Sequence, residues 1–323
     1  MATIKQVAQH AGVSVATVSR VLNDKGYVHE DTRKSVLKAI EELQYNPNSV
    51  ARSLFKKSSN TIGLLIPDIT NPFFPQLVRA VEDVMYPKGY TTILFNSDEN
   101  IQHELDYLKG MTSKYIDGVI VVSNTLKWEH LERLTTPVIA LDRHIDDRIA
   151  SVTIDNYESS LKALEFLVER GCKRIAHLAG PSHVFTSNER LRAYKDFTRK
   201  NGLEEIIQEG SYELQSGMLN TMQLLTKYQH IDAIFAGNDV MAIGALKAAA
   251  KLGIDVPKEL SVMGFDGVEW GTAVTPELTT MQQPIYQIGK KAAEMLLKRL
   301  ENPGLAPEHV RLNAELTVRQ STK

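Results

Sequence analysis

The 323-residue chain contains a single cysteine, Cys172, and its longest apolar runs are short. One cysteine excludes an intramolecular disulfide and is typical of proteins from a reducing cytoplasm. No run approaches the roughly 18 apolar residues of a membrane-spanning helix, and the first residues lack the apolar core of a signal peptide. With 43% hydrophobic and 24% charged residues, the composition is that of a globular protein. We therefore expect a soluble, cytoplasmic protein.

Motifs for nucleotide binding and hydrolytic catalysis are also missing. No two glycines are separated by one residue, which excludes a G-x-G-x-x-G fingerprint, and neither a P-loop nor a G-x-S-x-G elbow occurs. The nine histidines form no H-E-x-x-H pair. His177 and His183 have no cysteine or carboxylate at metal-ligand spacing, which favours structural roles. We therefore expect no enzyme activity, no cofactor and no metal ion.

Charge is unevenly distributed along the chain. Residues 1–60 contain nine lysines and arginines against five acidic residues, a net charge of +4, whereas the whole chain carries −2. The remaining residues therefore carry −6. A basic head on an acidic body predicts that only the head contacts a polyanion such as DNA. From charge alone, a chance imbalance is an equal alternative.

Residues 1–46 have the pattern of a helix-turn-helix domain with three helices. Thr3 and Gln6 have capping-box spacing, which predicts a helix start at about residue 3. Gly12 suits the turn because glycine tolerates positive φ, and Ser14 can cap the second helix. Apolar residues at helical spacing predict a third helix over about 31–44. A purely structural three-helix unit is the alternative interpretation.

The second helix carries short side chains that suit a DNA major groove. We expect Val15 or Val18 to form its buried side together with Val21 and Leu22. Small residues near its N-terminus let the helix approach base edges and thymine methyl groups, and hydroxyls and free amides hold phosphates. The candidate DNA contacts in this domain are Thr3, Ser14, Val15, Ala16, Thr17, Ser19, Arg20 and Asn23.

Residues 47–60 are a predicted hinge and linker. Pro47 ends the third helix, and Asn48 or Ser49 can cap a new helix that is too short to be stable alone. Leu54 is an isolated apolar residue among basic ones, which suits a wedge that enters a minor groove and kinks the duplex. A linker whose Leu54 packs on the body is an equal alternative. The candidate DNA contacts of the hinge are Ser49, Ala51, Arg52 and Leu54.

From residue 61 short apolar strands alternate with helical patterns, which predicts an α/β body of parallel sheets covered by helices. The strands are expected at 62–66, 91–95, 119–122, 138–141, 174–179, 233–236 and 260–265, with a further strand in TTMQQ that ends at Gln282. The helices are expected at about 75–88, 99–113, 157–171, 187–202, 216–229, 239–252 and 286–301. This length is large for one open sheet, so we expect two lobes with a cleft between them. The lobes are predicted at about 61–159 plus 284–312, and 160–283 plus the C-terminal tail.

Polar and aromatic residues follow many of these strands, where open α/β sheets bind their ligands. Carboxylates, amides and arginines supply the donors and acceptors that sugar hydroxyls need, and aromatic faces pack against sugar CH groups. Each residue alone is more commonly a helix cap, so the prediction rests on their convergence. The candidate ligand contacts are Asn71, Phe73, Phe74, Asp142, Arg143, Arg190, Asn238, Asp266 and Gln282.

The strings VSVATVSRVLN and NPNSVARSL, with NPFF, LDR, ND and GFDG in the body, resemble the lactose-repressor (LacI/GalR) family of bacterial transcription regulators. The resemblance covers essentially the whole chain. It implies a helix-turn-helix headpiece and a two-lobed body similar to periplasmic sugar-binding proteins, with the ribose-binding type matching particularly well. It also implies that Val15, Ala16 and Arg20 read bases and that Leu54 inserts at the operator centre.

In the body, the resemblance implies that Phe73 and Phe74 stack on a sugar whose hydroxyls the polar candidates bind. Tyr212 falls where the ribose-binding pattern has an aromatic lid, with tyrosine in place of phenylalanine. His29 departs from the family pattern, which has a serine cap at the start of the third helix. The C-terminal residues lack the leucine heptads that tetramerise the lactose repressor, so a dimer is expected.

Head and body together predict a homodimeric repressor that releases a palindromic operator when a ribose-like sugar closes the cleft. The alternatives for the signal are a phosphopentose held by Arg143 and Arg190, a purine corepressor, or a phosphorylated carrier protein that docks on the dimer. A solute receptor that serves a transporter is a remote alternative, because the chain has the DNA-binding head. Operator DNA and a small sugar are the expected partners.

Overall fold

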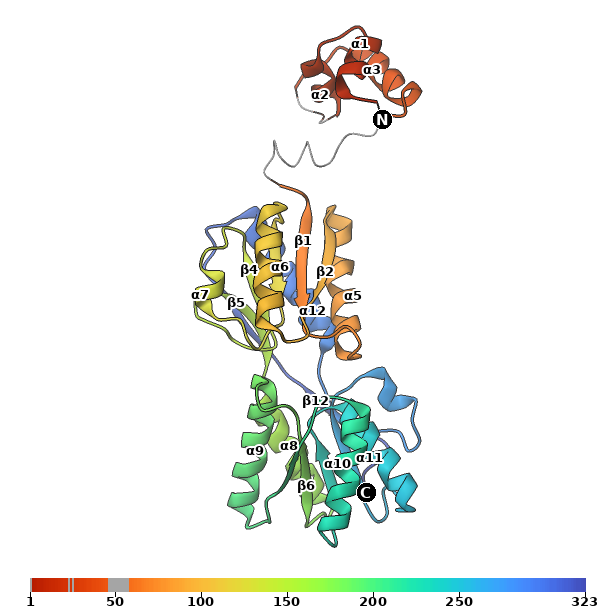
Figure 1. Ribbon diagram of the computed structural model, residues 1–323, viewed down its shortest axis with the longest axis vertical. Helices are drawn as coiled ribbons and strands as arrows, with labels where there is room; N and C mark the ends of the chain where they lie inside the picture. Colours follow the sequence, from red (N-terminus) through yellow and green to blue (C-terminus); the bar gives the residue numbers. More distant parts are fainter. Residues whose placement is uncertain (1, 23, 25, 46–57) are drawn as a thin grey trace. The chain divides into compact units, whose positions relative to one another are not determined.

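The computed structural model describes residues 2–22, 24, 26–45 and 58–323. The chain divides into two compact units, a head of residues 1–59 and a body of residues 60–323 (Figure 1). In the part of the chain that is described, no helix is both long enough and apolar enough to cross a membrane.

The head contains three helices, α1 (Ile4–His10), α2 (Val15–Leu22) and α3 (Glu30–Glu42). The predicted capping box is present, because the Thr3 hydroxyl accepts from the Gln6 amide and the Gln6 side chain accepts from the Thr3 amide. His29 caps α3 by accepting from the Asp31 amide, which replaces the serine of the family pattern. The head core is formed by Val7, Ala8, Val18, Val21, Val36 and Ala39.

The turn between α1 and α2 matches the expectation from sequence. Gly12 has a φ of +69°, and a Cβ there would meet nothing, so the backbone conformation explains the glycine. Ser14 accepts from the Thr17 amide at 3.2 Å and thereby caps α2. Val18 is fully buried, whereas Val15 is 40% exposed, so Val18 forms the buried side of α2 and Val15 faces outward.

The first lobe of the body is built on a six-stranded, all-parallel sheet. Its strand order is β11 (His309–Leu312), β5 (Ala150–Ile154), β4 (Val138–Leu141), β3 (Gly118–Val121), β1 (Thr61–Ile66) and β2 (Thr91–Asn96). Its helices are α5 (Phe73–Met85), η1 (Tyr86–Lys88), α6 (Ile101–Ser113), α7 (Trp128–Leu131) and α12 (Ile285–Glu301). In β1, Leu64 packs in the cluster with α5 and α12 while Leu65 packs against α6, so helices bury both faces.

The second lobe repeats this arrangement, with one antiparallel edge strand. Its strand order is β12 (Glu315–Thr317), β10 (Thr279–Gln282), β9 (Ser261–Asp266), β8 (Ala233–Ala236), β6 (Ile175–Ala179) and β7 (Ile206–Glu209). Its helices are α8 (Asn156–Glu169), α9 (Phe185–Asn201), α10 (Leu214–Lys227), α11 (Asp239–Leu252) and η2 (Glu269–Thr272). The carboxyl ends of the parallel strands in both lobes lie toward the middle of the body (Figure 1).

The chain passes between the lobes near residues 154–156, 283–285 and 312–315. The boundary predicted between residues 159 and 160 falls inside α8, which packs on α9 and β10 of the second lobe. The first lobe therefore ends with β5, about five residues earlier than expected. The four strands that were not predicted, β5, β7, β11 and β12, are short and mix polar with apolar residues.

In the second lobe, α10 and α11 approach each other at two glycines. A Cβ at Gly217 would lie 2.4 Å from the Met241 carbonyl oxygen, and one at Gly244 would lie 2.3 Å from the Leu214 carbonyl oxygen. Both clashes are with backbone, which a side-chain rotation cannot relieve. The close packing of these helices therefore depends on the two glycines.

Gly244→Ala is expected to lower the free energy of unfolding by about 1–3 kcal/mol, because the added methyl group pushes α10 away from α11. Urea denaturation of the full chain measures this. Gly110→Ala is the matched control, since Gly110 lies inside α6 with nothing within 4 Å of an added Cβ. It should be neutral or stabilise by up to about 1 kcal/mol, because alanine is the better helix former. Equal stability of the two variants would contradict the packing argument.

Candidate ligand cleft and DNA-binding helix

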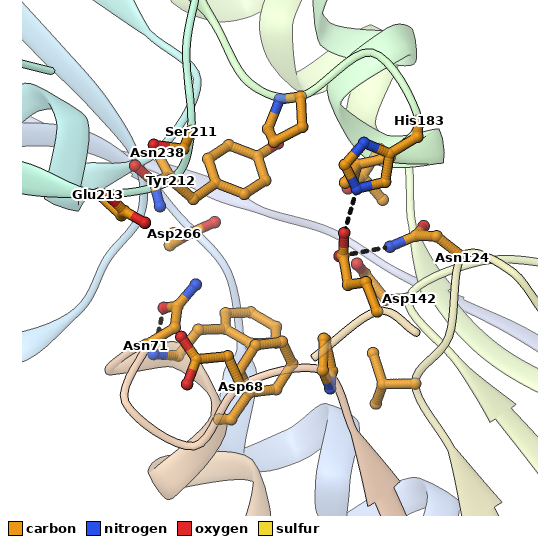
Figure 2. Close-up of a pocket in the computed structure, with 18 of the residues that line it drawn as sticks. Asp68, Asn71, Asn124, Asp142, His183, Ser211, Tyr212, Glu213, Asn238 and Asp266 are labelled. Carbon is orange, nitrogen blue, oxygen red and sulfur yellow. Dashed lines mark hydrogen bonds and ion pairs between the residues drawn. The ribbon is translucent and has the colours of Figure 1, made fainter. Parts of the chain in front are cut away.

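A cavity of about 380 Å³ lies between the two lobes of the body. Eight of the ten predicted ligand contacts line it: Asn71, Phe73, Phe74, Asp142, Arg190, Tyr212, Asn238 and Asp266. Figure 2 shows Asn71 on the first lobe across the cavity from Tyr212, Asn238 and Asp266 on the second. Each lobe therefore supplies both an aromatic surface and polar groups.

The aromatic surface of the first lobe comes from the first turn of α5. Phe73 and Phe74 pack edge to face, with ring centroids 5.2 Å apart and planes at 80°. The side-chain oxygen of Asn71 accepts from the Phe73 amide at 3.1 Å, which fixes the loop before the helix. Both rings are buried and line the cavity, so they offer a rigid apolar wall.

Arg190 is the central cation of the cleft and is held by three groups. Its side chain is 4% exposed, and Nε donates to Asn156 Oδ1 at 2.9 Å while Nη1 donates to the Gly237 carbonyl at 2.5 Å. Nη1 also lies 3.4 Å from Asp266 Oδ1. The guanidinium stacks on Phe265, with Cζ 3.7 Å from the ring centroid. These contacts fix its position before any ligand enters.

Two carboxylates of the cleft occupy backbone conformations that side chains rarely adopt. Asp142 has a φ of +68° and Asp266 a φ of +117°. Such strain costs on the order of 1–3 kcal/mol per residue and is concentrated at functional sites. Burial raises the pKa of Asp266 to about 6, although the nearby Arg190 lowers it, and burial also raises the pKa of Asp142.

Two buried amides present an unused polar atom beside the cavity. Asn238 Oδ1 caps α11 by accepting from the Met241 amide at 2.8 Å, and Gln283 Nε2 donates to Asp266 Oδ1 at 2.7 Å. Among the described residues, the opposite ends, Asn238 Nδ2 and Gln283 Oε1, are buried without a hydrogen-bond partner. Since an unsatisfied buried polar atom is costly, one free donor and one free acceptor indicate a ligand that both accepts and donates.

Asp239 supports the turn that positions Asp266. Its Oδ2 accepts from the Gly267 and Val268 amides, both at 2.8 Å, and its Oδ1 accepts from the Thr280 hydroxyl at 2.6 Å. A Cβ at Gly264 would lie 2.2 Å from Asp239 Oδ1, so the glycine makes room for this carboxyl group. Burial raises the pKa of Asp239 to about 8.

Two predicted ligand contacts do not line the cavity. Arg143 donates through Nε to the Ser123 carbonyl at 2.5 Å and through Nη2 to the Leu126 carbonyl, so it holds the loop after β3. Gln282 is exposed and accepts from the Thr317 hydroxyl at 2.9 Å. Successive side chains of a strand point to opposite faces, so the prediction was wrong by one residue and Gln283 lines the cavity instead.

A polar bridge between the lobes was not predicted from the sequence. Glu99 of the first lobe accepts from Asn124 Nδ2 at 3.1 Å and is hydrogen-bonded to His183 Nε2 of the second lobe. Asn124 Oδ1 accepts from the Phe185 amide at 3.2 Å, also across the cleft. These loop residues are far apart in sequence and fit no motif, so no local signal reveals them. Because the bridge lines the cavity, a ligand there contacts the groups that join the lobes.

The loops that carry this bridge are anchored on a buried carboxylate. Glu104 of α6 is 1% exposed and accepts from the hydroxyls of Ser97 at 3.3 Å and Ser123 at 2.9 Å, and from that of Thr125. These serines and this threonine flank Glu99 and Asn124 in sequence. The bridge is therefore positioned from inside the first lobe.

The head presents one face of α2 to solvent. Val15, Ala16 and Arg20 are exposed, while Thr17 and Ser19 are partly buried. Thr3 is occupied in the capping box of α1, and Ser14 caps α2. The remaining predicted DNA contacts lie outside the described residues: Asn23, Ser49, Ala51, Arg52 and Leu54.

Comparisons with known proteins match both units of the chain. The family model described as "Bacterial regulatory proteins, lacI family" matches residues 3–48, and that described as "Periplasmic binding protein-like domain" matches residues 164–322. The lac repressor dimer bound to operator and the anti-inducer ONPF is similar in structure, with a TM-score of 0.89, 28% identity and 99% of each chain covered. The expected fold of helix-turn-helix head and two-lobed body is confirmed.

Two further relatives concern ribose by name. The ribose operon repressor of Halalkalibacterium halodurans is 44% identical over 323 residues, which cover 100% of this chain and 98% of the relative. A LacI family regulator from Enterococcus faecium, solved with bound ribose, has a TM-score of 0.75 and 29% identity, with 81% of this chain and 98% of the other covered. With this full-length identity and the match of its head, the chain belongs to the lacI family of bacterial regulatory proteins.

Proposed function

We propose that the protein is a homodimeric, cytoplasmic transcriptional repressor that releases its operator when D-ribose binds the cleft. The observation that carries the sugar assignment is the pair of buried, unpartnered amide atoms, Asn238 Nδ2 and Gln283 Oε1, beside carboxylates and aromatic rings. Ribose has hydroxyls that donate and accept and CH groups that pack on rings. The ribose-related names of two relatives support the same choice.

In this proposal each group of the cleft has a defined part. Asp266 and Asp142 accept from ribose hydroxyls, and Asn238 Nδ2 donates to a ribose oxygen. Phe73 and Phe74 contact the apolar side of the sugar ring. The cleft binds ribose without transforming it, in line with the family of regulators to which the chain belongs.

The switch couples the cleft to the head through the lobes. Ribose that contacts both lobes favours the closed arrangement, and in a dimer this changes the spacing of the two α2 helices over their half-sites. A hundredfold change in operator affinity requires about 2.7 kcal/mol of coupling. Ribose supplies that energy only if it binds the closed form more tightly than the open one.

A phosphopentose is less compatible with this cleft than a free sugar. Arg190 is already bonded to Asn156, Gly237 and Asp266, and Arg143 binds backbone carbonyls outside the cavity. Arg143 therefore lies outside the cavity, and Arg190 has both Nε and Nη1 committed to protein groups, which leaves no full guanidinium for a phosphate. A purine or a phosphocarrier protein that acts as corepressor is distinguished from ribose by the change in operator affinity when it is added. A corepressor raises the operator affinity, and an inducer lowers it.

The proposal is tested by titrating the full-length protein with D-ribose, ribose 5-phosphate, xylose and glucose. Fluorescence of Trp270, which follows Asp266 by four residues and is 49% exposed, is the first readout, and calorimetry is the second. Saturable binding of ribose alone, with loss of operator binding on addition of ribose, is the expected result. Response only to the phosphate ester, or silence from all four sugars in both assays, would overturn the ribose assignment.

Ribose affinity is expected to fall about tenfold between pH 7.5 and pH 5, since one unit below a pKa of about 6 only about a tenth of Asp266 is ionised. The ionised carboxylate accepts from two hydroxyls, so affinity is full above the pKa and is lost as the pH falls through it. The groups that interact with Asp266 are Arg190, Gln283, Asp142 and Asp239. Calorimetry across this range measures the effect, and Asp266→Asn is the control, whose remaining ribose binding should no longer fall in this way because asparagine does not titrate.

A further inference from the structure

Two histidines and an aspartate converge on the first lobe, away from the cavity. His144 and Asp147 lie in the loop between β4 and β5, and His309 is the first residue of β11. The His144 Nε2 atom is 3.1 Å from an Asp147 carboxylate oxygen. One ligand atom from each of the three residues lies within 4.8 Å of those of the other two. The fold thus brings together residues more than 160 positions apart.

His309 is oriented by a neighbouring hydroxyl. Its Nδ1 lies 2.9 Å from the Ser151 Oγ, and its Nε2 lies on the Asp147 side, 3.3 Å from that residue's carbonyl oxygen. The contact with the carbonyl requires Nε2–H, so metal binding at Nε2 requires the other tautomer, in which Nδ1–H donates to Ser151 Oγ and Nε2 has a free lone pair. The His144 ring stands edge-on to the His309 ring, with centroids 4.8 Å apart. Ser151 therefore acts as the outer hydrogen-bond partner that histidine ligands commonly have.

The charged side chains next to this cluster are paired with other residues and do not bind Asp147. Arg148 binds both carboxylate oxygens of Asp146, at 2.6 and 2.8 Å, and its guanidinium lies 3.8 Å from the Trp128 ring centroid. Glu308, the residue before His309, forms an ion pair with Lys291 at 3.2 Å. The Asp147 carboxylate is highly exposed and lies 3.1 Å from His144 Nε2.

We propose that His144, Asp147 and His309 bind one divalent transition-metal ion, with zinc the best match. Two imidazole nitrogens and one carboxylate oxygen are a donor set that zinc takes, with a water in the fourth position. Zinc bonds of roughly 2.0–2.2 Å require the three side chains to move together, which their exposure permits. The bound ion links the edge strand β11 to the β4–β5 loop and so ties the last crossing segment to the first lobe.

The test is calorimetric titration of untagged, chelator-treated full-length protein with zinc chloride in a non-coordinating buffer. We expect one zinc per chain with a micromolar dissociation constant, and a loss of affinity of at least about tenfold in His144→Ala and in His309→Ala. His103→Ala, which removes an exposed histidine of α6, is the matched control and should bind zinc as the unaltered chain does. X-ray absorption of the loaded protein should show two imidazole ligands.

Unchanged zinc affinity in both histidine variants, or equal loss in the His103 control, would overturn the proposal. Ribose titration of the same variants separates this site from the cleft. Their ribose affinity should be unaltered, because none of the three residues lines the cavity. Failure of the zinc site would therefore leave the proposed function untouched.

Discussion

Asp266→Ala is expected to weaken ribose binding by at least about 100-fold while operator affinity changes by less than about twofold. In the proposed function the buried Asp266 carboxylate accepts from ribose hydroxyls, and hydrogen bonds to a charged group contribute about 1.5–3 kcal/mol each. Two such bonds lost correspond to about 100-fold or more, because each 1.4 kcal/mol is a factor of about ten. The head is a separate compact unit, so operator binding in the absence of ribose should be retained in this variant.

Calorimetry with ribose and a gel-shift assay with operator measure the two affinities. Alanine at position 266 meets the same φ of +117°, so Asp266→Asn serves as a second variant because asparagine tolerates positive φ better. Gln283→Ala and Gln282→Ala form a matched pair, since Gln283 lines the cavity and Gln282 does not. Only Gln283→Ala should lose ribose affinity. An Asp266→Ala protein that still releases operator at the usual ribose concentration would remove Asp266 from the site.

The fold was largely predictable because hydrophobic periodicity decides element type when elements are long or fully buried. The strands with continuous apolar runs, such as β1 and β8, were recognised, as were the seven long helices of the body. The strands that were missed lie mainly at sheet edges, where one side is open and polar residues such as His309 and Glu315 are tolerated. Their pairing comes from tertiary contacts that local sequence does not encode.

The cleft residues that directly follow a strand could be predicted from the sequence. Parallel strands deliver their following residues to one edge, so Asn71, Asp142 and Asp266 could be expected to meet. At the end of β10 a shift of one residue changes which side chain faces the cavity. Gln282 was predicted there, but Gln283 lines the cavity. The bridge of Glu99 and His183 depends on two loops from different lobes, which only the assembled fold brings together.

Strained and unpartnered groups gather at the cleft. Asp266 has a positive φ, and Asn238 and Gln283 each have a buried polar atom without a hydrogen-bond partner in the described part of the protein. In the proposed function, ribose oxygens and hydroxyls bond to these two atoms. If the bonds form fully only when the lobes are closed, ribose binds the closed form more tightly than the open one. That difference in affinity is the source of the coupling that induction requires.

Ala16→Glu is expected to weaken operator binding by at least about 100-fold and to leave ribose affinity unchanged. Ala16 is exposed in the first turn of α2, where glutamate is compatible with the helix because negative charge near an N-terminus is favourable. Facing DNA, the carboxylate replaces an apolar contact and meets the negative potential of the duplex, at about 1–3 kcal/mol per half-site. A homodimer places one α2 helix in each of two half-sites, so the loss of binding free energy occurs at both.

An operator selected from random DNA by the unaltered protein provides the probe, and salt is held constant because phosphate contacts make affinity salt-dependent. Gln9→Glu is the matched control, since it adds the same charge at an exposed position of α1. It should bind operator within about threefold of the unaltered protein, because its charge lies outside the groove and is screened within about 10 Å at ordinary salt. Comparable losses in both variants would mean that net charge of the head, and not the exposed face of α2, governs operator binding. Unaltered binding by Ala16→Glu would take α2 out of the major groove.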